Sequence, residues 1–267
     1  MTDHLKQKIL AKCREMEISL SGIADVCRWE DPSLNPDMPE AFYPRSIWPE
    51  AQSVLVIGLP VHLPALETSP SVWYREEYRT INGLLDQYTY RLAEYLNGQG
   101  YPAVSLPRDG YGDVSVLVDN PVAFFSHRHA AYLAGLGNFG VNNMLLTPQY
   151  GPRVRFGSVL TAASLPADPV QEGMLCTRCM QCVTQCPVQA LDEDDYPDGL
   201  TDKATCAGYS QTLQTQYRSP CGVCIKVCPV GEDRVHYHRE DTGIYRNRAG
   251  AERYHRAWEH VRRYGVK

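Results

Sequence analysis

The sequence contains no run of about 18 consecutive apolar residues, which is the length that a membrane-spanning helix requires. Its first residues, Met1 to Lys6, show neither a twin-arginine nor a secretory pattern. We therefore expect a cytoplasmic protein with no membrane partner. Basic residues are not in excess either, because 26 Lys and Arg stand against 31 Asp and Glu, for a net charge of −5. This balance gives no electrostatic basis for binding nucleic acid.

The end of the chain departs from this balance. After Gly231 there are nine Lys and Arg against six Asp and Glu. Such a segment is compatible with docking an acidic partner, but a solvated helix face explains the same composition. We interpret it as a solvated face on a helical tail over 233–267.

Cysteine is concentrated in one part of the chain, since eight of the ten lie between 176 and 228. A first run has the spacing C-x2-C-x2-C-x3-C-P, and a second consists of one upstream cysteine followed by C-x2-C-x3-C-P. In two-cluster ferredoxins, closely spaced thiolates face one 4Fe–4S cluster, while the cysteine before proline ligates the other. The spacing therefore predicts two 4Fe–4S clusters, one held by Cys176, Cys179, Cys182 and Cys228 and the other by Cys186, Cys206, Cys221 and Cys224.

Structural zinc and a disulfide framework are the alternatives for these cysteines. Zinc takes four ligands in a closed tetrahedron, which explains neither the third evenly spaced cysteine nor the two Cys-Pro ends. Disulfides are typical of small secreted chains, and this sequence shows no secretory pattern. Iron–sulfur ligation explains all the spacings, with Cys206 as the ligand that departs most from the simple pattern because it lies well upstream of Cys221.

Hydrophobic periodicity predicts a mixture of helices and strands around the cysteine runs. The predicted helices span 5–17, 80–97, 127–136 and 245–264, and the predicted strands span 53–61, 114–118 and 153–162. The segment 164–173, with Pro166 and Pro169, indicates a domain boundary. We therefore expect an α/β (α+β) fold with a cofactor and substrate domain over 1–168, a ferredoxin-like domain over 169–232, and the tail. Cys13 and Cys27 lie outside the two runs, and we expect them to be small buried hydrophobic residues.

Three closely spaced glycines, Gly135, Gly137 and Gly140, match the pattern G-x-G-x-x-G. In a dinucleotide-binding fold this motif follows a strand and opens a helix. Here the preceding residues, 129–134, resemble the end of a helix instead, so we do not expect nicotinamide binding. The glycines would let the backbone approach a large flat ligand, although a tight turn explains them almost as well.

Several segments, taken together, resemble a known superfamily. They are A-G-L-G-x2-G at 134–140, L-T-P-x-Y-G-P-R-V-R at 146–155, V-L-T at 159–161 and the cysteine runs. This combination is similar to the epoxyqueuosine reductases and the corrinoid-dependent reductive dehalogenases, and the resemblance extends over roughly 45–230. It implies a nitroreductase-like α/β domain that cradles a cobamide and receives electrons from a bacterial two-cluster ferredoxin-like domain.

The resemblance also suggests which residues would serve the cofactor and the substrate. Asp119 would be a general acid if burial raised its pKa, and is otherwise a turn residue before Pro121. Tyr150 is a second candidate proton donor, with Tyr74, Tyr78 and Tyr111 as rivals. The residues that would contact the cobamide are two arginines for a phosphate or carboxylate, the three loop glycines and an amide side chain: Arg128, Arg153, Gly135, Gly137, Gly140 and Asn142. Surface salt bridges or loop formation would explain the arginines and Asn142 equally well.

The sequence departs from the family pattern in several places. The Asp-x-x-Pro segment of the reductases is one residue shorter here, at Asp119-Asn120-Pro121, and Val141 follows the last glycine where a lysine is common. The helical-repeat region with which epoxyqueuosine reductases grip tRNA has no counterpart after the second cysteine run, so we expect no tRNA binding. No Asp-x-His-x-x-Gly motif occurs, so a cobamide would lack the histidine ligand that this motif provides.

These observations lead to one principal hypothesis and two alternatives. The principal one is an iron–sulfur oxidoreductase that passes electrons from an external low-potential donor, of ferredoxin or flavodoxin type, through both clusters to a cobalamin-type cofactor. The cofactor would serve the reductive cleavage of a small-molecule substrate. The first alternative is an electron-transfer protein that reactivates a corrinoid protein and has no substrate of its own. The second, a flavin in the same pocket, is the weakest because no flavin motif is present.

Overall fold

The computed structural model describes residues 2–34, 38–109 and 111–265. The helices are α1 Thr2–Glu15, α2 Pro44–Ile47, α3 Leu63–Glu67, α4 Val72–Gly98, α5 Val116–Asp119, α6 His127–Leu133, α7 Gln181–Thr184, α8 Lys203–Thr215, α9 Val223–Lys226, α10 Asp233–His236 and α11 Glu252–Arg263. The strands are β1 Leu20–Asp25, β2 Ser53–Pro60, β3 Ala103–Ser105, β4 Asn138–Phe139, β5 Leu145–Leu146 and β6 Val154–Thr161. Short 3₁₀ turns lie at Val26–Trp29, Glu40–Phe42 and Thr242–Tyr245.

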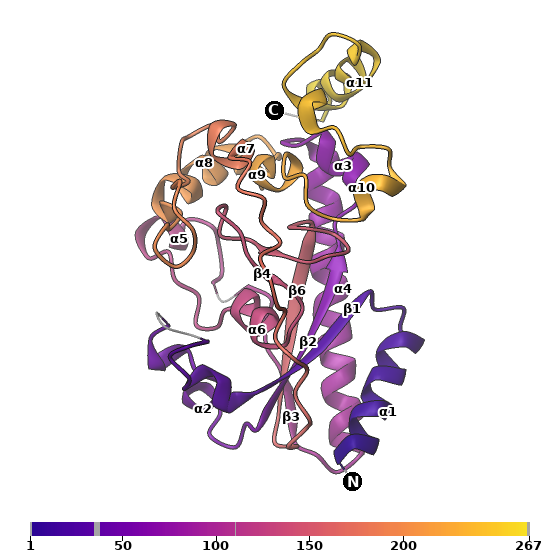
Figure 1. Ribbon diagram of the computed structural model, residues 1–267, viewed down its shortest axis with the longest axis vertical. Helices are drawn as coiled ribbons and strands as arrows, with labels where there is room; N and C mark the ends of the chain where they lie inside the picture. Colours follow the sequence, from indigo (N-terminus) through magenta and orange to yellow (C-terminus); the bar gives the residue numbers. More distant parts are fainter. Residues whose placement is uncertain (1, 35–37, 110, 266–267) are drawn as a thin grey trace.

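A four-stranded antiparallel sheet forms the centre of the N-terminal part, in the order β1-β2-β6-β3 (Figure 1). The two long strands, β2 and β6, pair over their whole length, from Ser53 opposite Thr161 to Pro60 opposite Val154. A separate two-stranded sheet joins β4 to β5. It lies in the connection between β3 and β6 of the main sheet.

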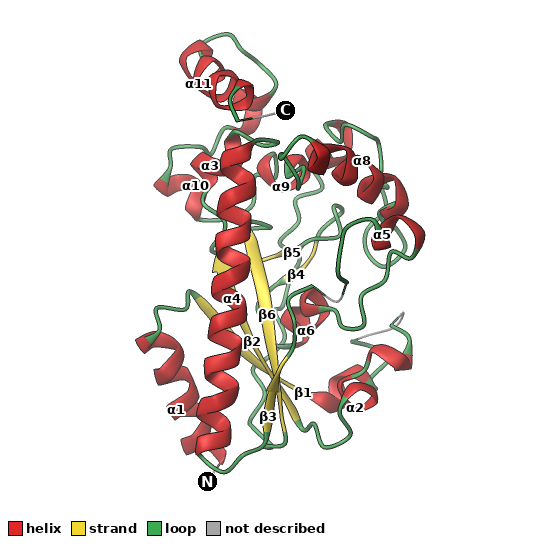
Figure 2. Ribbon diagram, turned by 180° about the vertical axis from the view of Figure 1, so that it is seen from behind, coloured by secondary structure: helices red, strands yellow, loops and turns green. Residues whose placement is uncertain are grey.

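Helices cover both faces of the main sheet because both faces are apolar. Along β2, Leu55 and Ile57 point into a core shared with α1 and α4, while Val54 and Val56 point into a second core shared with α6. This alternation is the period of two that a strand imposes. Figure 2 shows α4 and α1 on one side of the sheet, with α6 on the other.

The long helix α4 begins earlier than the predicted range of 80–97. The Ser71 side chain accepts a hydrogen bond from the Tyr74 backbone N–H and caps the helix at its N-terminus. The first turns are rich in charged residues, so their periodicity is weak. Further along, Ile81, Leu85 and Leu92 form the buried stripe that the sequence predicts.

Two local predictions were wrong. Residues 114–118 do not form a strand; Val116–Asp119 is a single helical turn, α5, which packs against α8. The Ser115 backbone N–H donates to the Asp113 carboxylate just before it, a local bond that favours a turn. Cys27 is exposed, with an Arg45 amino group 3.7 Å from its sulfur, whereas Cys13 is buried as expected.

The cysteine-rich segment lies across one end of the sheet, and its regular structure is limited to α7, α8 and α9 (Figure 1). Residues 164–173 lie in the long loop before α7. The predicted helix over 245–264 is shorter, at Glu252–Arg263, and packs through Trp258 against Tyr245. The division into units at 168 and 232 stays a prediction.

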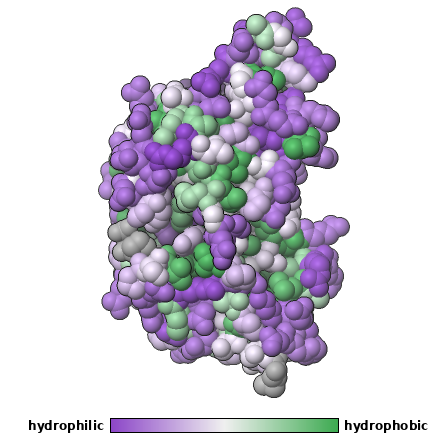
Figure 3. Space-filling model, in the orientation of Figure 1, coloured by the Kyte–Doolittle hydropathy of each residue, from purple (hydrophilic) through white to green (hydrophobic). Residues whose placement is uncertain are grey.

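The surface of the molecule is mainly hydrophilic on the face that Figure 3 shows, and its apolar residues form separate patches. In the part of the chain that the structure describes, no helix has both the length and the apolar character needed to cross a bilayer.

The close packing of α4 on β6 gives a test of the fold. A Cβ at Gly157 would lie 2.8 Å from Thr89 Cγ2, so Gly157→Ala is expected to destabilise the protein by about 1–3 kcal/mol. Gly83, within α4, has no atom within 4 Å of its Cβ position, so Gly83→Ala is expected to stabilise by about 0.5–1 kcal/mol. Urea unfolding of both variants measures these changes, and equal effects would contradict the packing described.

Candidate metal centre

The first predicted set of cysteines lines one small cavity. Cys176, Cys179, Cys182 and Cys228 surround it together with Asn142 and its neighbours from the loop before β5. Burial, and then the thiols of the other three cysteines, raises the pKa of Cys182 to about 11. The charges of the other three thiols therefore act on the Cys182 thiol.

The second predicted set gathers beside the first. Burial raises the pKa of the Cys224 thiol well above its ordinary value, and the largest further causes are the thiols of Cys221 and Cys206. The Cys206 pKa is raised by burial and then by Cys186. Cys206, the ligand that departs most from a simple ferredoxin, belongs to the first turn of α8. That helix returns the chain to the cluster region, which explains the long gap before Cys221.

Each set thus takes three cysteines from one part of the segment and one from another. Cys228 of the second run joins the first set, and Cys186 of the first run joins the second, as the spacing predicts. Thiol groups arranged in fours suit a 4Fe–4S cluster, which is held by four cysteine thiolates. Among the described residues, no group of three or more His, Cys, Asp or Glu side chains is placed to hold a single metal ion. Iron binding itself stays a prediction.

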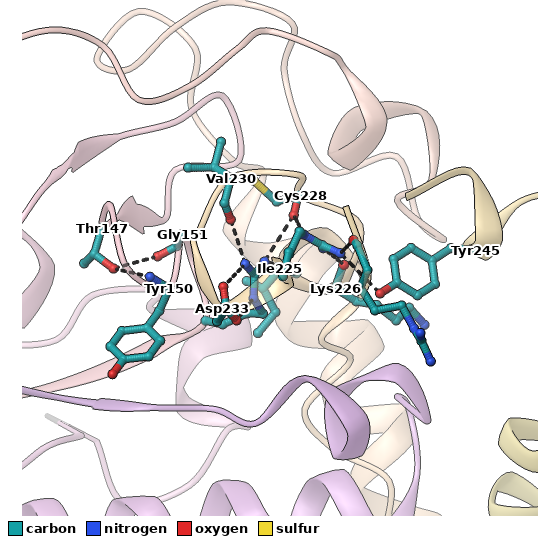
Figure 4. A network of polar contacts seen from close by, with 12 residues as sticks. Thr147, Tyr150, Gly151, Ile225, Lys226, Cys228, Val230, Asp233 and Tyr245 are labelled. Carbon is teal, nitrogen blue, oxygen red and sulfur yellow. Dashed lines mark hydrogen bonds and ion pairs between the residues drawn. The ribbon is translucent and has the colours of Figure 1, made fainter. Parts of the chain in front are cut away.

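Two buried arginines hold the backbone of Cys228 (Figure 4). The Arg153 side chain is fully buried and forms two hydrogen bonds with the Asp233 carboxylate, at 2.7 and 2.6 Å. It also donates to the Cys228 carbonyl oxygen at 3.1 Å and to the Val230 carbonyl oxygen at 2.7 Å. Arg234, which is 1% exposed, donates to the same Cys228 oxygen at 2.7 Å. Two guanidinium groups therefore fix the peptide of one predicted cluster ligand.

This contact changes the interpretation of two parts of the sequence. We predicted that Arg153 contacts a cofactor, and in the structure its donors are used to attach β6 to the second cysteine run. The basic tail was interpreted as a solvated face, and this is wrong for Arg234. Sequence reasoning missed both Asp233 and Arg234; their position just after the second Cys-Pro was the one signal available.

The glycine loop packs against the rest of the chain. A side chain at Gly135, where φ is +75°, would collide with the Pro169 carbonyl oxygen, and one at Gly137 would collide with the Leu146 carbonyl oxygen. At Gly140 the Cβ would lie 2.6 Å from a methyl carbon of Leu146. These contacts account for the glycines, and their predicted role in binding a cofactor stays untested. The motif follows α6, a helix, which agrees with the rejection of a nicotinamide site.

Two asparagines after the glycine loop face the cysteine-rich segment. Asn142 borders the cavity of the first set, and its Oδ1 accepts a hydrogen bond from the Met144 backbone N–H at 3.1 Å. Asn143 donates to the Gly199 carbonyl oxygen and accepts from Thr201. This loop therefore packs against the cysteine-rich segment through the cavity of the first set and through Gly199 and Thr201.

Positive charge collects between α6, β6 and the second set. Arg128 is exposed and donates to the Asn143 carbonyl oxygen; desolvation by the surrounding protein atoms, and then the charge of Arg155, lower its pKa. Arg155 lies over the Tyr78 ring, 4.3 Å from its centroid, and donates to Asn82. The charges of Cys224 and Tyr78 also act on Arg128. This region could hold an anionic group close to the second set of cysteines.

The two predicted proton donors lie elsewhere. The Asp119 side chain is exposed at the end of α5, without the burial that the general-acid hypothesis requires. Tyr150 is half-buried in the turn before β6, where its backbone N–H donates to Thr147 Oγ1 and its ring points away from Cys228 (Figure 4). The structure does not bring these two residues together with Arg128 in any described contact.

Known proteins are similar to this chain in sequence and in fold. The 4Fe-4S binding domain family matches residues 174–192. Epoxyqueuosine reductase of Synechococcus sp. (strain RCC307) is 29% identical over 262 residues, covering 86% of this chain and 75% of that protein. Tetrachloroethene reductive dehalogenase of Desulfitobacterium hafniense is 28% identical, covering 66% of this chain and 32% of that protein. This chain is a homologue of the epoxyqueuosine reductases and the reductive dehalogenases.

Solved structures of both groups have the same fold. A catabolic reductive dehalogenase superposes with a TM-score of 0.67 at 18% identity, over 92% of this chain and 34% of that one. Epoxyqueuosine reductase from Bacillus subtilis superposes with a TM-score of 0.57 at 19% identity, over 91% of this chain and 70% of that one. The predicted mixed fold with a ferredoxin-like motif towards the C-terminus is confirmed. The chain spans about a third of the dehalogenases' length.

Loss of one cysteine tests the crossed ligation. Cys224→Ala is expected to remove the second cluster and to weaken the first, because each predicted cluster takes ligands from both runs. Iron and sulfide analysis after anaerobic reconstitution measures this loss. Cys13→Ala, which removes a buried thiol outside the segment, is the control and should keep the full content. Full iron content in Cys224→Ala would refute the ligand assignment.

The buried ion pair gives a second test. Arg153→Met leaves the Asp233 carboxylate buried without its cation, and we expect a loss of about 3–5 kcal/mol in the free energy of unfolding. Arg178→Met removes a pair with Asp195 in which both side chains are more than 40% exposed, so its expected cost is below about 1 kcal/mol. Urea unfolding of the two variants compares these costs. Similar costs would show that Arg153 does not attach the second run.

Proposed function

We propose that this chain is an iron–sulfur oxidoreductase that carries electrons through two 4Fe–4S clusters to an acceptor bound beside the second cluster. A cobamide is the acceptor that the homologous dehalogenases suggest, since one related solved structure is described as supporting B12-dependent dehalogenation. The observation that carries the proposal is the gathering of eight cysteines into two adjacent groups of four, with the exposed cation Arg128 near enough to Cys224 for their charges to interact.

The two sets differ in their surroundings, which supports a direction of electron flow. Each set has one exposed cysteine, Cys179 in the first and Cys206 in the second, so an external donor of ferredoxin or flavodoxin type would reach the clusters from the surface of this segment. Cys224 of the second set is packed against the core that contains α4, together with Tyr78. Electrons would therefore leave from the second cluster towards the N-terminal part.

The residues beside Cys224 suit an anionic acceptor or substrate. Arg128 and Arg155 would hold a phosphate or carboxylate, because Arg128 is exposed, Arg155 is partly exposed, and their like charges repel each other. A cobamide bound there would supply the low-valent cobalt chemistry of reductive cleavage. The residues of the chain would orient the substrate and provide the proton.

Tyr78 is the best-placed proton donor among the tyrosines we considered. It lies under Arg155 and shares a core with Cys224, whereas Asp119 is exposed and Tyr150 turns away from the cysteines. Roles for Asp119 and Tyr150 stay predictions. The exposure of Asp119 favours the second candidate function, an electron-transfer protein that acts on a separate corrinoid protein.

Cobalamin binding distinguishes these functions. The reconstituted protein is titrated with hydroxocobalamin under reducing, anaerobic conditions, and its optical and EPR spectra are compared with those of free cobalamin. A changed cobalt signal is expected, and Arg128→Met should weaken binding about tenfold, the loss of one charge-assisted contact. The exposed Arg178→Met serves as the control. Unchanged spectra on a protein with intact clusters would overturn the cobamide proposal and favour the electron-transfer function.

A further inference from the structure

A second cavity lies away from Arg128, between the C-terminal tail and the segments that carry the second set of cysteines. Its volume is about 370 Å³. It is lined by Trp258 and Arg262 of α11 and by Pro187 and Lys226, which are neighbours of predicted cluster ligands. Glu67 of α3 and the residues Ser69 and Pro70 between α3 and α4 also line it, and Figure 1 shows α11 close to α3.

Two cations on these walls have no carboxylate among their hydrogen-bond partners in the described structure. The Lys226 ammonium, on a residue that is 7% exposed, donates to the Ser69 carbonyl oxygen at 2.9 Å. Arg262 donates to the carbonyl oxygens of Thr68 at 2.9 Å and Glu67 at 3.0 Å. These bonds leave donors on both groups unused, since an ammonium has three N–H groups and a guanidinium has five.

The other charges around the cavity are already balanced. The Glu67 carboxylate is held by Arg239 at 2.7 Å and by the Tyr245 hydroxyl at 3.0 Å. Glu259, the acidic neighbour of Arg262, pairs with Arg248 at 3.0 Å. The cavity therefore has an excess of positive charge, and keeping the buried Lys226 and the partly buried Arg262 together without an anion is unfavourable.

A buried hydroxyl on the cavity wall gives an independent indication. Ser69 is 1% exposed, and its Oγ has no hydrogen-bond partner among the described residues. Buried hydroxyl groups in native proteins are nearly always hydrogen-bonded, so an unpaired one indicates a missing partner. Ser69 also supplies the carbonyl oxygen that Lys226 contacts, which places both groups at the same end of the cavity.

We propose that this cavity binds a small organic or inorganic anion through a phosphate or carboxylate group held by Lys226 and Arg262. Lys226 follows Cys224 by two residues, and its charge also acts on Cys221. A bound anion would offset that charge and lower the reduction potential of the second cluster, so the site would couple the tail to electron transfer. The proposal requires neither a cobamide nor a particular substrate.

Titration calorimetry on the anaerobically reconstituted full chain tests the proposal, with inorganic phosphate in one arm and benzoate in the other. Saturable one-to-one binding of at least one probe is expected, together with a change in the fluorescence of Trp258. Arg262→Met should weaken it about tenfold, the loss of one charge-assisted contact, and Arg262→Lys should restore part of the affinity. Arg263→Met removes an adjacent but 77% exposed cation and should bind as the parent does.

A potentiometric titration followed by EPR provides the second readout. A saturating concentration of the probe should shift one of the two cluster midpoint potentials to a more negative value. This shift should be absent in Arg262→Met. The absence of saturable binding in both arms would overturn the proposal. Equal affinity of Arg262→Met and Arg263→Met would also overturn it, because binding would then be non-specific.

Discussion

Arg153 lies without access to water at the start of β6 and pairs with Asp233, 80 residues further along the chain. The same guanidinium donates to the carbonyl oxygens of Cys228 and Val230, so one side chain connects the central sheet to the end of the second cysteine run. Apart from α8, the helices of the cysteine-rich segment are single turns, and its small hydrophobic core joins Cys182 and Val227 to Val141 of the glycine loop. Its arrangement therefore depends on polar contacts with the N-terminal part more than on its own hydrophobic packing.

The charge distribution around the two sets of cysteines is consistent with their proposed role. Burial raises the pKa of thiols in both sets, so without metal they favour the protonated form. Iron ligation needs thiolates, and cluster assembly would release these protons while fixing the loops that carry the sulfurs. Arginine and lysine side chains lie near both sets, with Arg153 and Arg234 at Cys228 and Arg128 at Cys224. Such cations would stabilise the negative charge of clusters bound by four thiolates.

Local patterns in the sequence predicted the elements whose signals lie within a few residues. The β2 and β6 strands are continuous apolar runs, and the later turns of α4 carry a regular buried stripe. The sequence therefore predicted both strands and this part of the helix. Cysteine spacing predicted the two groups because ligand geometry limits the distances between sulfurs along the chain. The short turn at α5 was mistaken for a strand because a few alternating apolar residues do not distinguish the two.

Contacts between distant segments could not be predicted in the same way. Nothing near Arg153 in the sequence indicates that its partner is Asp233, and a basic tail gives no sign that Arg234 is buried while Arg263 is exposed. The loop glycines were interpreted as space for a ligand, whereas Gly135 and Gly137 face carbonyl oxygens of the chain itself. Residue type was informative in each case, but the partner was set by tertiary structure.

The number of iron atoms per chain tests the central claim most directly. The full chain, reconstituted anaerobically, would be analysed for iron and acid-labile sulfide, and its reduced form examined by EPR. Two clusters require about eight iron and eight sulfide per chain, and their proximity should broaden or split the EPR signals through magnetic interaction. About four iron with one unsplit signal, or zinc in place of iron, would contradict the account of two clusters with crossed ligation.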